Sequence, residues 1–393
     1  MQKLGEIAEI STGFPFEGHK YTSIGIRVVR GENIGQGELR WDEKVDKRWN
    51  ESTSALDNYW LYEGDIVMQM DGNVGKNIAR IYTADPMLIA QRVACIRAKE
   101  KCSQDYIYGI LRTKLFKNYI ERCATGTSIK HISLQQISDF EFDFHLPEIQ
   151  AKLGRLIADI DDKIRVNRQI NDNLEAMAKQ LYDYWFVQFD FPNEEGKPYK
   201  SSGGAMVWND KLKRKIPQGW DFCFLEDLLT IRNGRDHKHL ADGIYPVYGS
   251  GGEMRKASEY LYDGESVLMP RKGSLNNIMY VNESFWTVDT MFYSEMKLSN
   301  CAKYIYYTIK DIDFTRWDSG TGVPSMTSST LYSIKLVKPQ NETLKKFDEM
   351  ISPLFEHMKQ ISGQNVVLTK QRDELLPLLM NGQASVNYHL SDD

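Results

Sequence analysis

The stretch LGEIAEISTG at residues 4–13 and the stretch LEDLLTIRNG at residues 225–234 decide the fold of this chain. Each is a short segment with periodic apolar residues that ends on a glycine. A recurrence more than half the chain length apart indicates an internal repeat, which has to be recognised before single residues are interpreted. The sequence therefore predicts two copies of one unit.

Further landmarks recur in the same order in both halves. YEGDIVMQMDGNVGK at residues 62–76 and YDGESVLMPRKGS at residues 262–274 each carry a Gly-acidic pair, an apolar run and a glycine-containing polar loop. TGTSIKHISLQQIS at residues 125–138 and SGTGVPSMTSSTLYS at residues 319–333 each place Gly-Thr before a polar loop. Apolar runs bounded by glycine are strand and turn signals. Each half therefore predicts a globular unit of strands and short helices.

Each half ends in a long helical pattern. Apolar residues recur with a seven-residue period over residues 148–186 and again over residues 343–381. We expect the two helices to pair, with Asn167 and Asn365 fixing their register, and both parallel and antiparallel pairing remain open. Two amphipathic helices packed on their own domains are the alternative, but both stripes exceed the usual globular helix length. Pro353 predicts a kink or a restart of the second helix.

Length and composition limit the class of protein. A chain of 393 residues is long enough for two to three domains. A net charge of −5 excludes a polycation, so an acidic partner would have to be met by local basic patches. The five cysteines include no C-x-x-C spacing, which argues against a zinc site and a disulfide framework and favours a cytoplasmic protein with reduced thiols. Neither a signal peptide nor a run of eighteen apolar residues is found.

Catalytic motifs are not found in the sequence. There is no NPPY or DPPY, no G-x-G-x-x-G after a strand and no G-x-x-x-x-G-K-[ST], so neither a methyl-donor site nor an ATP site is predicted. His237 and His239 have a spacing that could bind metal on a strand, but without a nearby cysteine or paired carboxylate we favour contact with phosphate or base. The sequence thus predicts a non-catalytic chain that holds no metal and no cofactor.

Polar loop residues at matching places in the two halves suggest DNA binding. Reading DNA requires donors that reach base edges, together with lysine or arginine on phosphates. A solvent-facing loop explains any one such residue, whereas the matched sets favour DNA. The candidates in the first half are Arg30, Asn33, Asn73, Lys76, Asn77, Arg80, Thr127, Ser128, Lys130 and His131. The candidates in the second half are Arg232, Asn233, Arg235, His237, Lys238, His239, Arg255, Lys256, Arg271, Lys272, Ser274, Asn276 and Asn277.

The stretch between the halves adds a resemblance. WFVQFDFPNEEGKPYKSSGG followed by KLKRKIPQGW, within residues 185–220, combines with the paired loops and the unit-helix-unit-helix order. This combination resembles the specificity (S) subunit of type I restriction-modification systems. The resemblance implies an α+β fold: two duplicated α/β target-recognition domains separated by a pair of long antiparallel coiled-coil-like helices, with pseudo-two-fold symmetry.

The resemblance also implies a function and a set of partners. The two domains would read the halves of an interrupted, asymmetric site in double-stranded DNA. The chain would assemble with two methyltransferase (M) subunits and, in the full complex, with restriction (R) subunits. S-adenosylmethionine, ATP and Mg are expected on those partner subunits. The docking surface is expected at the helix ends, with the candidate residues Tyr182, Trp185, Phe186, Phe189, Leu376 and Leu379.

The same reading divides the chain into segments. The predicted segments are the first target-recognition domain at 1–146, the first long helix at 147–187, a linker at 188–219, the second target-recognition domain at 220–338, the second long helix at 339–384 and a C-terminal tail at 385–393. A helix of about 38 residues spans about 57 Å, and one turn of duplex about 34 to 36 Å. Antiparallel helices would therefore place the two half-sites about one turn apart.

Two other classes of function remain. A non-catalytic coiled-coil adaptor with two protein-binding domains would share the duplicated architecture, and strong salt dependence of binding to duplex DNA would separate it from a DNA reader. A self-contained nuclease or methyltransferase would require activity from the isolated chain.

Overall fold

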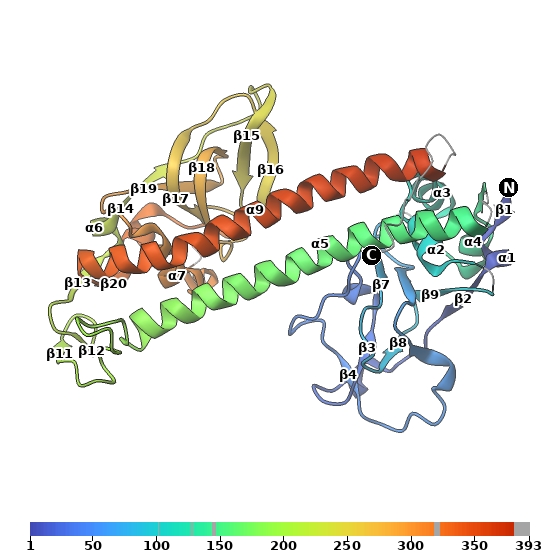
Figure 1. The fold of residues 1–393 in the computed structure, drawn as a ribbon, viewed down its shortest axis with the longest axis horizontal. Coiled ribbons are helices and arrows are strands. Elements are labelled where there is room, and N and C mark those ends of the chain that lie inside the picture. Colours follow the sequence, from blue (N-terminus) through green and yellow to red (C-terminus); the bar gives the residue numbers. More distant parts are fainter. Residues whose placement is uncertain (101, 127–128, 144–146, 318–322, 381–393) are drawn as a thin grey trace, which may run out of the picture. The chain divides into compact units, whose positions relative to one another are not determined.

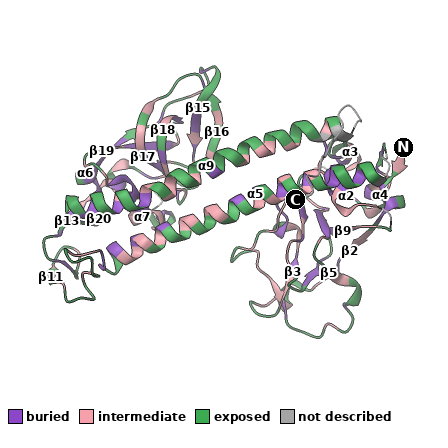
Figure 2. Ribbon diagram, in the orientation of Figure 1, coloured by how far each residue is buried: buried purple, intermediate pink, exposed green. Residues whose placement is uncertain are grey.

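The computed structural model describes the chain except residues 101, 127–128, 144–146, 318–322 and 381–393. The chain divides into two compact units, Met1–Gln169 with Ile361–Asp393, and Ile170–Gln360. Both long helices contribute residues to both units. Figure 1 colours the chain along its sequence, so each helix can be followed by residue number. Figure 2 shows the buried residues gathered in the sheets and at intervals along the two long helices.

The first unit contains two four-stranded sheets. One has the order β2-β9-β6-β7 with antiparallel pairs, and the other has the order β4-β3-β8-β5, in which β3 and β8 are parallel. A further pair, β1-β10, forms a two-stranded sheet. The strands of this unit are β1 (Gln2–Lys3), β2 (Ala8–Thr12), β3 (Ile26–Val29), β4 (Arg48–Trp49), β5 (Trp60–Leu61), β6 (Ile66–Gln69), β7 (Ile78–Arg80), β8 (Met87–Ile89), β9 (Val93–Ala98) and β10 (Glu141–Phe142).

Short helices cover the first sheet. The side chains of Ser103, Thr113 and Ser133 cap the amino ends of three of them, as these residue types commonly do. The helices are α1 (Leu4–Ile7), α2 (Gln104–Leu111), α3 (Lys114–Cys123) and α4 (Leu134–Ser138), with 3-10 turns at Gly18–Lys20, Gly31–Asn33 and Asp57–Tyr59. Helices and sheet share one apolar core, which includes Ile66 and Tyr106.

The second unit has a six-stranded sheet with the order β14-β19-β17-β18-β15-β16. Two further pairs, β11-β12 and β13-β20, form two-stranded sheets. The strands of this unit are β11 (Met206–Asn209), β12 (Arg214–Pro217), β13 (Asp221–Phe224), β14 (Leu229–Asn233), β15 (Asp242–Gly249), β16 (Gly252–Ala257), β17 (Tyr262–Pro270), β18 (Met279–Thr287), β19 (Met291–Met296) and β20 (Lys335–Lys338). Its helices are α6 (Leu225–Leu228), α7 (Ala302–Lys310) and α8 (Ser328–Tyr332), with a π-helical turn at Asp183–Val187 and a 3-10 turn at Phe314–Trp317. The stretch predicted as a linker forms the β11–β12 hairpin.

The repeated opening stretch forms the same structure twice. In each unit a four-residue helix, α1 or α6, is followed by a strand that pairs with β9 or β19. The strand ends at Gly13 or Gly234, where a Cβ atom would lie 2.1 Å from the Ile89 oxygen or 2.0 Å from the Val288 oxygen. Because only glycine permits this close approach of two backbones, the shared glycine marks the same backbone contact in both units.

The long helices α5 (Pro147–Tyr182) and α9 (Asn341–Met380) pack together antiparallel. In the first unit Asn167 donates to Asn365 at 2.9 Å. In the second unit Asn171 donates to the Met358 oxygen at 3.5 Å. Partner numbers fall along α9 as they rise along α5, which decides between the two pairings that the sequence left open. The predicted α+β class with two β-rich domains and two packed helices is confirmed.

The predicted restart at Pro353 is wrong, since α9 is continuous through this residue. Pro353 lies on the exposed side of the helix. Water can there hydrogen-bond the carbonyl group that loses its backbone donor, so one proline does not end a helix whose other face is packed. Within the described residues, no helix combines the length and apolar character that crossing a membrane requires.

Candidate nucleic-acid interface

Three segments of the first unit meet where strand β6 ends. We call the residues that they bring together, Asp71, Arg92 and His131, the first junction. The Asp71 carboxylate lies 2.8 Å from His131 Nδ1 and 3.6 Å from Arg92 Nε. Arg92 has a φ of 71°, which is uncommon for a residue with a side chain. The backbone hydrogen bonds that hold the segments together run from Met70 N to Arg92 O, from Gly72 N to Lys130 O and from Ile132 N to Met70 O.

The second unit builds the same meeting point where strand β17 ends. The residues at the matching positions are Lys272, Thr290 and Ser325, which we call the second junction. The equivalent backbone hydrogen bonds run from Arg271 N to Thr290 O, from Gly273 N to Pro324 O and from Met326 N to Arg271 O. Gly72 and Gly273 both have positive φ, 79° and 91°, so the chain turns in the same way at both junctions.

The second junction borders a hollow of about 250 Å³. Three predicted DNA-binding residues, Asn233, Arg271 and Lys272, line it together. The other lining residues are Phe292, Ser325, Met326, Thr327 and Ser328. Amide, guanidinium, ammonium and hydroxyl groups around one hollow provide the donors and acceptors that base edges and phosphates require.

The predicted residues of the first unit fall into two groups. Asn73, Lys76 and Lys130 are exposed beside the first junction, while Asn77 donates to Gln69 Oε1 at 2.8 Å. Lys76 also lines a hollow of about 200 Å³ with Lys114 and Lys117 of α3, two lysines that the sequence reading missed. Thr127 and Ser128 lie outside the described residues. A basic surface therefore extends from the junction loop to α3.

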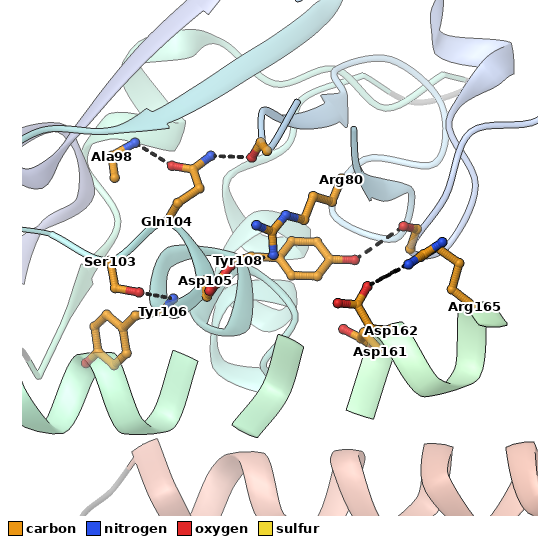
Figure 3. Close-up of polar contacts among 12 residues, drawn as sticks. Arg80, Ala98, Ser103, Gln104, Asp105, Tyr106, Tyr108, Asp161, Asp162 and Arg165 are labelled. Atoms are coloured by element: carbon orange, nitrogen blue, oxygen red, sulfur yellow. Dashed lines mark hydrogen bonds and ion pairs between the residues drawn. The ribbon is translucent and has the colours of Figure 1, made fainter. Parts of the chain in front are cut away.

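Three other predicted residues of the first unit are engaged inside it. Asn33 is fully buried and donates to the oxygens of Arg40 and Val45. Arg30 pairs with Glu32 at 3.1 Å. Arg80 forms an ion pair with Asp105 of α2, and the two residues face each other in Figure 3. Contact with DNA would require these side chains to leave their present partners.

The remaining predicted residues of the second unit are also divided. Arg232 pairs with Glu295 at 3.1 Å, and Arg255 donates to the Leu240 oxygen at 2.6 Å. Asn276 and Asn277 hydrogen-bond Asp313 and the Ser250 oxygen. Arg232 and Asn276 are nevertheless exposed, as are Arg235, Lys238, His239, Lys256 and Ser274.

The two histidines at residues 237 and 239 differ in their surroundings. His237 buries Nδ1 without a partner among the described residues, whereas the His239 ring lies 6.0 Å from that of Trp286. Nowhere in the described part of the chain do three or more His, Cys, Asp or Glu side chains come close enough to hold a metal ion.

The predicted docking residues at the end of α5 belong to the core of the second unit. Tyr182, Trp185, Phe186 and Phe189 are all buried there. Burial raises the pKa of Tyr182 to about 12, and its hydroxyl donates to Thr308 Oγ1 at 3.0 Å. Buried side chains offer a partner little area, so their docking role remains a prediction. Leu376 and Leu379 belong to α9, and their side chains lie outside the described part of the chain.

The sequence reading missed several residues of the junctions. Asp71, Arg92, Thr290 and Ser325 were not among the candidates. Asp71 directly precedes a glycine at the end of a strand, which is a turn signal that could have been used. The part played by Arg92 carries no local signal, because it lies 21 positions from Asp71 in the sequence.

Comparison with known proteins places this architecture. The family described as "Type I restriction modification DNA specificity domain" matches residues 1–176 and 217–367. The type I restriction enzyme MjaIX specificity subunit of Methanocaldococcus jannaschii is 25% identical over 331 residues, which cover 77% of this chain and 74% of that protein. The EcoAI specificity subunit of Escherichia coli is 32% identical over 183 residues, which cover 45% of this chain and 30% of that protein.

A solved structure shares the fold. The crystal structure of the S subunit of a type I restriction-modification system from M. genitalium superposes with a TM-score of 0.60 at 16% identity. The superposition covers 96% of this chain and 95% of that one. At this identity the likeness supports the fold alone.

Proposed function

We infer the function of this chain from its family: it belongs to the type I restriction modification DNA specificity family. It is a specificity subunit, the non-catalytic part of a type I restriction-modification enzyme. The finer statements below, on how it reads DNA and what it binds, are our proposals.

Each unit recognises one half-site, here called a word, of a bipartite, asymmetric DNA target. The observation that carries this proposal is the junction, which is built twice with the same backbone hydrogen bonds and with different side chains. A backbone frame that is kept presents its loops in the same way, while changed side chains alter which base edges can be contacted. The target therefore consists of two different words separated by unread bases.

The surroundings of the second junction support a role in contacting DNA. Asn233, Arg271 and Lys272 line one hollow together with hydroxyl groups. Asparagine pairs well with adenine and arginine or lysine with guanine, and lysine also binds phosphate. This concentration of donors in a chain of net charge −5 favours DNA over the adaptor hypothesis.

Catalysis resides on the partners. The chain docks two methyltransferase (M) subunits and, in the full complex, restriction (R) subunits, and these carry S-adenosylmethionine, ATP and Mg. The chain selects the site, and the methyltransferase modifies a base that is flipped out of the duplex.

The test is to co-express the chain with an M subunit of its own system and to map methylated bases across a genome by single-molecule sequencing. We expect one interrupted, asymmetric motif, of which one word changes when the loop at residues 271–277 is exchanged for that of a relative. Methylation of the same motif without this chain would contradict the proposal.

The adaptor hypothesis gives a different result in a binding experiment. A DNA reader loses affinity for duplex steeply as salt rises, because bound lysines and arginines displace counterions. Binding of the assembled complex to a duplex with the mapped motif should fall by about a thousandfold or more between 50 and 200 mM salt if six or more phosphates are contacted. The adaptor would be favoured if the affinity for duplex did not depend on salt and if exchange of the loop at residues 271–277 left the methylated motif unchanged.

A further inference from the structure

We propose that Asp71 is a specificity-determining residue of the first unit. Its carboxylate accepts a hydrogen bond from the amino group of a cytosine or an adenine in the major groove. Lys272, at the same place in the second unit, donates to a guanine. This inference rests on the proposed function and deepens it, since it assigns a class of base to one position in each word.

The two residues occupy equivalent backbone positions. Each lies two residues after the end of its strand, β6 or β17, and precedes a glycine of positive φ. Each also forms an isolated bridge with the loop after the Gly-Thr segment, Asp71 with His131 and Lys272 with Ser325. Side chains that leave matching backbone positions face matching parts of a ligand.

Asp71 is partly exposed and lies beside two groups that can reduce its repulsion by an anionic ligand. Its side chain is 30% exposed, so it is not a core residue. His131 Nδ1 lies 2.8 Å from one oxygen and Arg92 Nε 3.6 Å from the other. A carboxylate near DNA is repelled by phosphates, and a neighbouring arginine reduces that repulsion. An ionised carboxylate only accepts hydrogen bonds, so it selects a base edge with an amino donor, as in cytosine N4 or adenine N6.

The second junction presents the opposite chemistry. Lys272 is exposed and takes part in no ion pair with the described residues. Its neighbours at the positions of Arg92 and His131 are the uncharged Thr290 and Ser325. An ammonium group only donates, and guanine presents two acceptors, N7 and O6, on its major-groove edge. The reversal of charge at one shared position therefore predicts different bases.

The experiment compares single variants of the full chain, each co-expressed with the M subunit, by mapping methylated bases. Asp71→Asn keeps the size of the side chain and adds a donor, and Asp71→Lys reverses its charge. Lys272→Gln is the matched change in the second unit. His131→Gln and Arg92→Gln keep Asp71 while removing its two neighbours. They therefore show whether Asp71 itself contacts the base or only orients His131 and Arg92.

We expect Asp71→Asn and Asp71→Lys to change one position of the first word and to leave the second word intact. Asn should shift the position towards adenine or relax it, and Lys should admit guanine. Preference for the original base at this position should fall by about tenfold. Lys272→Gln should relax one guanine of the second word alone. His131→Gln and Arg92→Gln should lower the rate of methylation without changing the motif.

The contrary outcomes are also distinct. Methylation of the unchanged motif at a lower rate by both Asp71 variants would overturn the assignment. A motif change in His131→Gln that equals that of Asp71→Asn would overturn it too, because the reading group would then be His131. If the wild-type chain itself yielded no interrupted motif, the proposed function would fail first, and the variants would not be needed to show it.

Discussion

The two units hold the long helices by different chemistry. In the first unit a buried carboxylate, Asp161 of α5, pairs with Arg112 beside α2 and with Arg372 of α9, the latter at 2.9 Å. In the second unit Phe347 of α9 packs on Phe186 with ring centroids 4.8 Å apart and on Trp185 at 5.7 Å. A charged cluster depends on geometry and on each partner, whereas an aromatic cluster depends on contact area. Duplicated domains therefore need not hold their helices by the same kind of contact.

The charged cluster joins three elements in one place. Figure 3 shows Asp161 on α5, close to Asp162, with Tyr108 of α2 nearby. The Arg112 guanidinium also donates to the Tyr108 hydroxyl at 3.3 Å, and burial raises the pKa of Tyr108 to about 12. Burial alone would lower the pKa of Arg372, but the Asp161 carboxylate raises it overall. Tyr108 is therefore neutral and Arg372 charged at neutral pH.

The largest expected effect is on the aromatic cluster. Phe347→Ala should destabilise the second unit by about 3–5 kcal/mol, because a fully buried ring is lost and leaves a cavity. Cys223 and Cys301 belong to the same core, and burial raises the pKa of each thiol to about 12. Both should therefore react faster with a thiol reagent in the variant, as read by mass spectrometry.

Two internal references sharpen this test. Cys95 is buried in a different core, in the first unit, and its labelling should not change. Met350→Ala removes a side chain that is 49% exposed on the same helix and should leave all three thiols protected. Equal acceleration at Cys95 would mean that the two units do not open separately.

The next effect concerns the charged cluster. Asp161→Asn leaves two guanidinium groups together without their carboxylate, which costs 3–5 kcal/mol for a fully buried pair. Because the side chains of Arg112 and Arg372 are 13% and 14% exposed, we expect about 2–3 kcal/mol. Hydrogen exchange of α2 in the full chain should measure the loss.

A matched control lies one residue away. Asp162 is 47% exposed and pairs with Arg165 at 3.3 Å, so Asp162→Asn should cost less than about 0.5 kcal/mol. Similar exchange rates in the two variants would show that burial does not distinguish these carboxylates, and the comparison between the units would lose its basis.

A smaller effect is expected where the helices carry a polar pair. Asn365→Leu removes the nearer of two acceptors of the buried Asn167 amide, the other being Gln364 Oε1 at 3.4 Å, and should cost about 1 kcal/mol. Changing both residues to leucine should recover that stability or exceed it, because no unpaired amide is left. A double-mutant cycle from chemical denaturation measures the coupling. Additive losses would mean that the two asparagines do not act as a pair.

The smallest effect is expected at exposed pairs on α9. Lys345 and Glu349 lie 3.9 Å apart and are more than half exposed. Glu349→Gln should change the free energy of unfolding by less than about 0.5 kcal/mol, since solvent screens such pairs. A larger loss would show that charge pairs matter to this chain irrespective of burial.

The features that the sequence predicted correctly, the repeat and the two paired helices, are those encoded by residues close together in the chain. Gly13 and Gly234 end the two repeated stretches, and in the structure only glycine fits there because another backbone passes close by. The seven-residue stripes predicted two helices that pair, and Asn167 and Asn365, predicted to fix their register, are hydrogen-bonded to each other. The repeat and the helical periodicity can be recognised from neighbouring residues, whereas the contact that requires glycine at residue 13 is made with the distant Ile89.

The candidate site was predicted only in part. Asn233, Arg271 and Lys272 do line one hollow. Asn33 was indistinguishable from them as a loop asparagine, although it is fully buried and satisfies the Arg40 and Val45 carbonyls. Exposure is decided by what packs over a residue, and residue type alone does not reveal it.

The duplication, the α+β class and the pairing of two long helices can be inferred without a structure, because the repeated stretches, the strand runs and the heptads are patterns of neighbouring residues. Only the tertiary structure decided that the helices are antiparallel and that the aromatic residues at the end of α5 enter a core. It alone also brought Asp71, Arg92 and His131 to one place. Those contacts join residues tens to hundreds of positions apart, and packing the whole chain is what brings them together.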